Sequence, residues 1–439
     1  MLKNAGYIFF ILFALCVCIS KAAANILFGV LMLLTVIYLV RYPRKEFFSK
    51  NTWVLVLLFP FAIGLVASFF SLMGMEGAGE FLGRFRFFLL ILPFAAFIDG
   101  EKKLNTLFVM LNLSAFAGVA WGFFHSDFND IWGNFNGLHT IGRNSDILFS
   151  ISLMNMAALF AYRCQSMKCN VLFKILILVN IVLMLSGVMF MGRRGSLLGL
   201  LAGVVILLIF FRKLFMITLV AASLVFAAYH SDTWIAQRMK SINSDTWIVQ
   251  RIKSIKDLEG NESNTARLQL AQTGIDYLVD ERLFLRGTGA KHSTSFFEDY
   301  FNAKPEDYKK KYSTVPQYFG NFHNSFLQMA IEAGGLFLLL FLGSTLYMMG
   351  VMVKRLPKLA RNQRVYPIAA MAVTWAFFVS QFFHGDLYRY GGIPYILVFS
   401  AGCVMCRPVE IMEKEEILTP PDPDQPLLDD PSGPGAPIA

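Results

Sequence analysis

A histidine followed by amide and carboxyl side chains is the first feature of the sequence that could do chemistry. His323 lies where a long hydrophilic segment ends and a hydrophobic stretch begins, so its imidazole is expected where water meets membrane. Asn324, Gln328 and Glu332 follow at intervals of four residues, which places them on one face of a helix. Polar side chains at membrane depth face a bundle interior or a wet cavity. Helix capping is an alternative explanation of Asn324, but a cap does not need an imidazole.

Arginines form a second set of candidates, because they lie in connections that should carry little positive charge. The set comprises Arg84, Arg86, Arg143, Arg193, Arg194 and Arg389, against the single lysine Lys21. A guanidinium presents a fork of donors to phosphate oxygens and stays charged at membrane depth, whereas a lysine can lose its proton. These arginines therefore indicate a site for a lipid-anchored phosphate or pyrophosphate at the outer leaflet.

The pair Arg193-Arg194 is the sharpest case, because it is expected at the tip of a very tight hairpin between apolar segments. Gly192 and Gly195 flank it and leave room for a ligand. Snorkelling to lipid headgroups is the alternative for this pair, as it is for Arg84 and Arg86. For Arg389 the alternative is an ion pair with Asp386.

The elements that position these residues are expected to be membrane-spanning helices. Of the 439 residues, 56% are hydrophobic and 16% charged, and the mean hydropathy is +0.54, which indicates an all-α polytopic membrane protein. A helix needs about 20 apolar residues to cross a bilayer. The sequence predicts about twelve spans, near residues 7–20, 22–40, 52–73, 86–99, 105–124, 146–162, 171–191, 196–211, 214–229, 326–350, 366–383 and 392–406. The first apolar run has no convincing cleavage site, so it is expected to be the first span.

Charge alternates between the connections and predicts the topology. The basic connections contain Arg41, Arg44, Lys45 and Lys50; Lys102 and Lys103; Arg163 and Lys168; Arg212 and Lys213; Lys354, Arg355, Lys358, Arg361 and Arg364; and Arg407. Connections rich in Lys and Arg face the cytoplasm. Both termini are therefore expected in the cytoplasm, and the net charge of +9 reflects topology rather than nucleic-acid binding.

Four regions follow from this topology. Residues 1–229 are expected to hold the first nine helices, residues 230–322 a large outer loop with a small helical subdomain, residues 323–407 the last three helices, and residues 408–439 a disordered cytoplasmic tail. The loop begins with a tandem repeat of thirteen residues, 231–243 and 244–256. Each copy could form an amphipathic helix along a membrane surface, or the repeat could be a recent neutral duplication.

The sequence contains no motif for a nucleotide, a metal or a nucleophilic serine. Gly287 and Gly289 lack the strand context of a nucleotide-binding turn. None of the six cysteines lies in an outer loop, so no structural disulfide is expected. Because no ATP is present outside the cytoplasm, a reaction there needs an already activated donor such as a polyprenyl-pyrophosphate-linked sugar. We expect no cofactor and no metal.

The order of these motifs resembles the bacterial O-antigen ligase and polymerase superfamily. The motifs are Gly192-Arg193-Arg194-Gly195-Ser196-Leu197-Leu198, Ala266-Arg267, Gly287-Thr288-Gly289, His323-Asn324-Ser325-Phe326-Leu327-Gln328 and Glu332-Ala333-Gly334. The resemblance covers roughly residues 180–400 by motif and the whole chain by topology. The His-Asn segment looks most like that of the lipid A-core:surface polymer ligases.

The resemblance implies a glycosyltransferase of the bacterial inner membrane whose active site faces the periplasm. It implies transfer of a polysaccharide from undecaprenyl pyrophosphate to a lipid A-core sugar, without metal. By motif His323 matches the proposed catalytic base, Arg194 the hairpin arginine and Arg267 the loop arginine, and Arg389 matches more loosely. Arg193 stands where the family often has serine, so either hairpin arginine could bind phosphate. The supporting candidates are Asn324, Arg286, Arg84 and Arg86.

His323 would take the proton of an acceptor hydroxyl while arginines stabilise the departing pyrophosphate, which gives a one-step, inverting displacement. A covalent intermediate would instead need a carboxylate, and Asp386 and Glu332 are the nearest. Two alternatives remain. A polymerase would use the same donor, and a transporter of lipid-linked oligosaccharides would bind it without chemistry; transporters often show repeats between their halves, which this sequence lacks.

Overall fold

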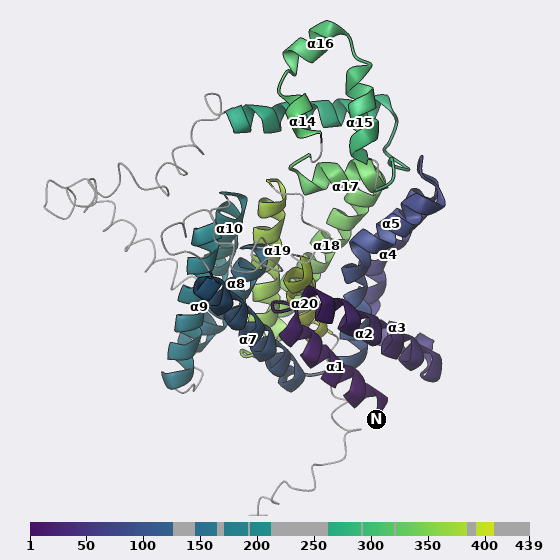
Figure 1. Cartoon of the computed structure of the whole chain (residues 1–439). Coiled ribbons are helices and arrows are strands. Elements are labelled where there is room, and N and C mark those ends of the chain that lie inside the picture. Colours follow the sequence, from purple (N-terminus) through teal and green to yellow (C-terminus); the bar gives the residue numbers. More distant parts are fainter. Residues whose placement is uncertain are drawn as a thin grey trace, which may run out of the picture. The chain divides into compact units, whose positions relative to one another are not determined.

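The computed structural model describes residues 1–125, 145–164, 171–191, 194–211, 262–290, 293–319, 322–383 and 392–407. Every regular element in these ranges is a helix (Figure 1). The all-α expectation is therefore confirmed for the described part of the chain. The chain divides into two compact units, Met1–Cys406 and Arg407–Ala439, and every described helix belongs to the first. The tandem repeat, the predicted span 214–229 and the predicted tail 408–439 lie outside the described residues.

The helices of the first half range in length from the five residues of η1 to the 25 residues of α7. They are α1 (Leu2–Cys16), α2 (Lys21–Arg41), α3 (Arg44–Lys50), α4 (Thr52–Phe69), α5 (Met75–Phe85), η1 (Arg86–Leu90), α6 (Ile91–Phe97), α7 (Glu101–His125), α8 (Ser145–Cys164), α9 (Val171–Met191) and α10 (Arg194–Phe210). The second half comprises α14 (Glu262–Asp280), α15 (Ser293–Asn302), α16 (Glu306–Lys311), η3 (Val315–Tyr318), α17 (Ser325–Ala333), α18 (Gly335–Arg355), η4 (Leu356–Lys358), α19 (Val365–Gln381) and α20 (Gly392–Met405).

Four of the described helices are long and apolar enough to cross a membrane. They are Lys21–Arg41, Thr52–Phe69, Glu101–Trp121 and Gly335–Lys358. Six shorter apolar helices accompany them: Leu2–Cys16, Asp146–Leu159, Lys174–Val188, Gly195–Phe210, Val365–Gln381 and Gly392–Met405. Apolar runs of this kind favour helices because a helix satisfies its own backbone hydrogen bonds. The described helices are consistent with a polytopic membrane protein.

Two predicted spans differ from the structure. Residues 86–99 are not one helix: η1 is followed by the short α6, and Leu90, Phe94 and Phe97 are completely buried. Their hydrophobicity thus reflects burial in the protein interior. Residues 326–350 are also not one helix, because α17 ends at Ala333 and α18 begins at Gly335. Gly334 between them has a φ of +97°, which glycine adopts far more easily than other residues.

The helix α19 packs against α10, α20 and α8. Close approach of α10 to α19 depends on two glycines. A Cβ at Gly199 would lie 2.4 Å from the carbonyl oxygen of Ala376, and one at Gly203 would lie 3.0 Å from that of Ala372. Small residues allow helix backbones to approach in this way. The starting residues of α10 and the end of α19 are therefore held in fixed relation.

Residues 262–290 and 293–319, the described part of the expected outer loop and here called the outer segment, have a hydrophobic cluster of their own. It is built from α14, α15 and η3 together with α17, and its members include Tyr277, Phe297, Phe301, Phe322 and Ile331. The helix α17 therefore contributes to two hydrophobic clusters. Its Ile331 packs in the cluster of the outer segment, and its Phe326 and Met329 pack in the main core. This shared helix follows directly after His323 and Asn324, so it links the outer segment to the helical bundle.

Candidate functional site

A buried carboxylate joins three helices beside the predicted site. Asp146 lies in the first turn of α8 and is 3% exposed. Its Oδ1 accepts hydrogen bonds from Ser196 Oγ at 3.0 Å and from Ser380 Oγ at 2.8 Å. Its Oδ2 accepts one from Gln381 Nε2 at 2.8 Å. A buried carboxylate needs such donors, since leaving it without them would carry a large desolvation cost.

The hydrogen bonds continue from Gln381 to α17. Gln381 is fully buried, and its Oε1 accepts a hydrogen bond from Ser325 Oγ at 2.8 Å. The path Ser325–Gln381–Asp146–Ser196, here termed the Asp146 network, therefore runs from the first residue of α17 to the first turn of α10. It passes through the last turn of α19 and the first turn of α8.

The Asp146 network connects segments whose residues the sequence analysis identified separately as candidate site residues. Ser325 is two residues after His323, and Ser196 is two residues after Arg194, the first residue of α10. Gln381 ends α19, after which the chain continues toward Arg389. Arg193 and Arg389 themselves lie outside the described residues. The segment after His323 and the start of α10 are thus connected, through Gln381, to one buried carboxylate.

His323 adopts an uncommon backbone conformation just before α17. Its φ is +51°, in the left-handed region that residues other than glycine rarely occupy. Such conformations persist only where the surrounding structure enforces them, and they cluster at active sites. The side chain is half-buried, which lowers the pKa of the imidazole, and the positive charge of Arg267 lowers it further. His323 is therefore kept neutral near pH 7, the form that can accept a proton.

Arg267 lies on α14, one turn after the start of the described part of the outer segment. Its side chain is half-buried, and its neighbour Ala266 is fully buried. The close packing of α14 on α17 passes through Gly274, where a Cβ would lie 2.7 Å from Leu327 Cδ2. The structure therefore brings the charge of Arg267 within range of His323, although the two residues are 56 positions apart in the sequence.

Asn324 caps α17, as the capping alternative predicted. Its Oδ1 accepts hydrogen bonds from the backbone amides of Phe326 at 3.0 Å and Leu327 at 3.1 Å. A cap of this kind satisfies amides that the first helical turn leaves without partners. The cap fixes the backbone immediately after His323, so Asn324 supports the histidine structurally.

The predicted polar face of α17 is buried and ends in an ion pair. Arg84 on α5 donates to Glu332 Oε1 at 2.6 Å, and Gln328 Nε2 and Ser293 Oγ donate to the same oxygen at 2.8 and 3.1 Å. Glu332 Oε2 has no hydrogen-bond partner among the described residues. Burial raises the pKa of Glu332 to about 7, and the nearby Arg84 guanidinium opposes this rise. Arg84, a candidate phosphate ligand in the sequence, is thus engaged with a carboxylate.

The other supporting arginines occupy different places. Arg86 donates to the Gly83 carbonyl at 2.8 Å and to Asn25 Oδ1 at 3.1 Å, and its guanidinium lies 4.9 Å from the centre of the Phe87 ring. Arg286 is exposed in the turn that follows α14. The Asp146 network includes neither residue.

The glycine pair Gly287 and Gly289 holds this turn against α17. The amides of Thr288 and Gly289 donate to the carbonyls of Ile331 at 2.7 Å and Glu332 at 3.0 Å. Gly287 has a φ of +62°, and a Cβ there would lie 2.4 Å from the Glu332 carbonyl oxygen. These two amides are bonded to helix carbonyls, so they do not form a phosphate-binding loop.

Sequence reasoning missed Asp146 and Gln381, and it included Ser196 and Ser325 only as parts of motifs, without a role in this network. A signal for Asp146 existed, since it is the one acidic residue of α8, and an ionisable residue within an apolar helix usually has a function. Gln381 had no comparable signal. Among the described residues, no group of three or more His, Cys, Asp or Glu side chains could hold a metal ion.

Comparison with protein families gives a match to part of the chain. Residues 179–342 match the family described as O-antigen ligase. The matched segment runs from α9 into α18 and includes Arg194, Arg267, His323 and Glu332. No curated protein sequence matches the chain. The family match supports membership of the O-antigen ligase superfamily, in agreement with the resemblance carried by the sequence motifs.

Proposed function

We propose that this chain, a member of the O-antigen ligase superfamily by its family match, is a ligase that completes a surface glycolipid. It transfers a polysaccharide from undecaprenyl pyrophosphate to a sugar of lipid A-core, at the periplasmic face of the bacterial inner membrane. The observation that carries this proposal is the Asp146 network, because it holds the start of α10 next to the His323 segment. A base and a phosphate-binding segment at one place suit transfer from a pyrophosphate donor.

His323 acts as the general base in this proposal. Its imidazole takes the proton of the acceptor hydroxyl while that oxygen bonds to the anomeric carbon of the donor sugar. The lowered pKa of His323 keeps the imidazole unprotonated, as a base requires. The bond between the anomeric carbon and the pyrophosphate oxygen breaks in the same step, so the anomeric centre inverts.

Arginines stabilise the departing undecaprenyl pyrophosphate. Arg194 and Arg267 contact the phosphate oxygens, aided by Arg193 and Arg389. Fixed positive charges near developing negative charge are usually the largest single contribution to catalysis. Arg267 has two effects in this arrangement, because its charge also lowers the pKa of His323.

The position of Glu332 disfavours this residue as the nucleophile of a covalent intermediate, and Asp386, the other candidate, lies outside the described residues. Glu332 lies near the end of the nine-residue α17, while His323 precedes that helix. At 1.5 Å per residue the helix rises about 10 Å along its axis from Ser325 to Glu332. One oxygen of Glu332 is also occupied by Arg84, Gln328 and Ser293. A nucleophilic carboxylate would have to lie beside the anomeric carbon.

A deletion experiment tests the proposal and separates it from its alternatives. Cells without the protein should accumulate polymer on undecaprenyl pyrophosphate while they keep complete, uncapped lipid A-core. Single repeat units attached to lipid A-core, with long polymer lost, would instead identify a polymerase. Donor that remains on the cytoplasmic side would identify a transporter.

A reconstituted reaction tests the chemistry directly. Purified protein, lipid-linked donor and lipid A-core acceptor should suffice, without nucleotide and in excess EDTA. Activity that is lost to chelation and restored by magnesium would contradict the expectation of metal-independent transfer.

A further inference from the structure

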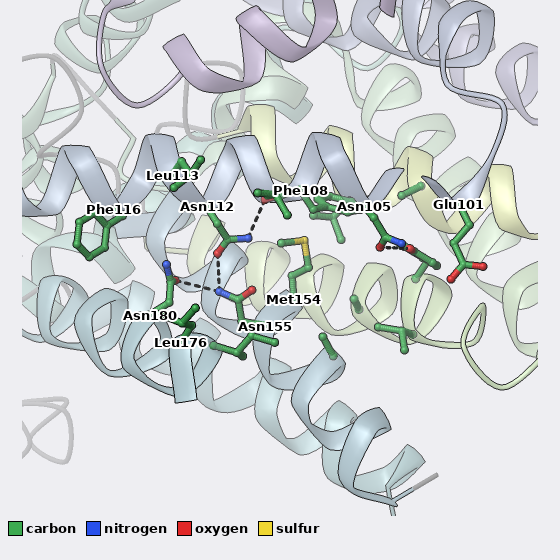
Figure 2. Close-up of a pocket in the computed structure, with 18 of the residues that line it drawn as sticks. Glu101, Asn105, Phe108, Asn112, Leu113, Phe116, Met154, Asn155, Leu176 and Asn180 are labelled. Atoms are coloured by element: carbon green, nitrogen blue, oxygen red, sulfur yellow. Dashed lines mark hydrogen bonds between the residues drawn. The ribbon is translucent and has the colours of Figure 1, made fainter. Parts of the chain in front are cut away.

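A cavity of about 690 Å³ lies between α7, α8, α9, α19 and α20, and it contains no residue of the Asp146 network (Figure 2). Its size is within the range of about 300–1,000 Å³ that is usual for small-molecule sites. Tyr366, in the first turn of α19, lines the cavity, whereas Gln381 at the end of that helix belongs to the Asp146 network. The two residues are 15 positions apart on this helix, which corresponds to about 22 Å. The cavity is therefore a second, separate site.

A row of polar side chains follows α7 along the cavity. Glu101, Asn105 and Asn112 all line it, at positions that share a helix face. At the deep end Asn155 Nδ2 donates to Asn112 Oδ1 at 2.6 Å and to Asn180 Oδ1 at 3.0 Å (Figure 2). These three asparagines hydrogen-bond to one another, so the deep end of the cavity does not require a polar ligand.

The other end of the cavity is polar and reaches the end of the helices. Asn362 Nδ2 donates to Glu101 Oε2 at 2.6 Å, and the Tyr366 hydroxyl donates to Asn105 Oδ1 at 2.6 Å. Glu101 is the first residue of α7, and Asn362 precedes α19. From Glu101 to Asn112 the helix rises over 11 residues, or about 16 Å. That length corresponds to one leaflet, half of the hydrocarbon thickness of about 30 Å.

The apolar walls of the cavity, which extend past Asn112 to Phe116, open outward. Val109, Leu113 and Phe116 on α7 are 47%, 49% and 46% exposed, and Leu176 and Val179 on α9 are 57% and 53% exposed. All five line the cavity. The helix α7 includes one of the four candidate membrane spans, and α9 contains one of the shorter apolar helices. The cavity thus opens sideways toward the hydrocarbon of a membrane.

Charge limits what can occupy the polar end. Among the described residues that line the cavity, Glu101 is the only charged one, and none is a lysine or an arginine. A phosphate placed beside Glu101 would be repelled, whereas an ammonium group would be attracted. Lys102 and Arg361, adjacent in sequence to the lining residues Glu101 and Asn362, are exposed. A ligand with an amine beside Glu101 and a phosphate nearer Lys102 and Arg361 would satisfy these charges. The headgroup of a zwitterionic phospholipid has both groups.

We propose that this cavity binds one phospholipid with a primary amine in its headgroup. The amine contacts Glu101, and one acyl chain lies between α7 and α9 with its end at Asn112, Asn155 and Asn180. The lipid comes from the leaflet on the Glu101 side, opposite to the Asp146 network. The proposal does not depend on the proposed transfer reaction. A polyprenyl pyrophosphate is disfavoured at this place, because it would bring two phosphates to the cavity's carboxylate.

Native mass spectrometry of the full-length protein tests the proposal. The protein is reconstituted in vesicles with equal amounts of phosphatidylethanolamine and phosphatidylglycerol that have the same acyl chains, and is then extracted in mild detergent. We expect one retained phosphatidylethanolamine, preferred by about two- to fivefold, the range for a partly exposed ion pair. Glu101→Gln should retain a lipid but lose this preference.

Cavity-filling variants provide the matched control. Ala158→Phe places a ring in the cavity and should abolish retention. Ala22→Phe makes the same change at an exposed position of α2 outside the cavity and should retain the lipid. Equal retention of phosphatidylethanolamine in both variants, or no retained phospholipid in the unmodified protein, would overturn the proposal. An unchanged preference in Glu101→Gln would overturn it even if Ala158→Phe failed to fold.

Discussion

Gln381 and Asp146, 235 positions apart in the sequence, are joined by a hydrogen bond of 2.8 Å in the interior of the helical bundle. This contact joins the end of α19 to the start of α8. The side-chain carbonyl oxygen of Gln381 accepts a second hydrogen bond, from the Ser325 hydroxyl. One glutamine therefore couples the His323 segment to the buried carboxylate. In the side-chain amide of Gln381 the nitrogen donates one of these hydrogen bonds and the oxygen accepts the other.

Asp146→Asn should destabilise the protein and reduce transfer. The new amide nitrogen would face a donor from Gln381 or the two serines, so at least one buried group would lose its partner at a cost of about 1–3 kcal/mol. Displacement of the site by about 1 Å can cost on the order of 100-fold in rate. Thermal unfolding and transfer assays measure the two effects.

Asp99→Asn is the matched control, because Asp99 is 31% exposed and pairs with Lys103 at 2.7 Å. An exposed ion pair contributes only about 0–1 kcal/mol, so this variant should unfold and transfer almost as the unmodified protein does. If Asp146→Asn behaved in the same way, the Asp146 network would have no positioning role.

His323→Ala should separate chemistry from donor binding. Removal of a general base lowers a rate by about 10²- to 10⁴-fold, but no phosphate contact is lost. The variant should still retain undecaprenyl-pyrophosphate-linked glycan in a pull-down while it yields no capped lipopolysaccharide. Near-normal transfer by His323→Gln would assign the base elsewhere.

Arg194→Ala should weaken both donor retention and transfer. Arg194→Lys should recover little of either if paired guanidinium contacts matter.

The pH profile of transfer should report on the surroundings of His323. Burial and Arg267 lower the pKa of the imidazole, so it stays unprotonated to a lower pH than a free histidine, whose pKa is about 6.5. The acid limb of the rate profile should therefore lie below about pH 6.5. Arg267→Ala removes one of the two causes and should move that limb to higher pH. Arg286→Ala, at an exposed arginine of the same segment, should leave it in place, and an identical shift in both variants would refute the assignment.

Stability should depend on pH through Glu332. Burial raises its pKa in the folded state to about 7, above the value of about 4.3 expected in the unfolded chain. The folded protein binds the proton more tightly, so the contribution of this group to stability is complete below about pH 4.3 and is lost as the pH rises toward 7. Melting temperatures of the unmodified protein and of Glu332→Gln should therefore diverge across this window. Parallel curves would contradict the raised pKa.

The predicted topology can be tested by labelling single cysteines in an otherwise cysteine-free protein. Lys310 in α16 and Arg361 before α19 are both exposed. An impermeant reagent should label Lys310→Cys in cells whose outer membrane has been permeabilised, and it should not label Arg361→Cys. The reverse pattern would place the outer segment in the cytoplasm.

Local features of the fold could be predicted from the sequence, because they depend on neighbouring residues. The segment 171–191 coincides with α9, and the capping role of Asn324 follows from its side chain and the helix that begins after it. The face shared by Gln328 and Glu332 follows from helical periodicity.

Contacts between distant segments could not be predicted. Nothing near Asp146 in the sequence specifies that Gln381 will bind it, and nothing near Arg84 specifies Glu332, 248 positions away. The division of residues 326–350 into two helices depends on the turn at Phe284 and Leu285, whose backbone atoms lie against Gly334. A hydropathy pattern contains no information about such partners.

The glycine contacts between α10 and α19 have a mechanical consequence. Because backbone atoms meet directly at Gly199 and Gly203, no side-chain rotation can separate these helices, and they must move as one rigid body. The start of α10 and the end of α19 therefore reach the Asp146 network as one unit.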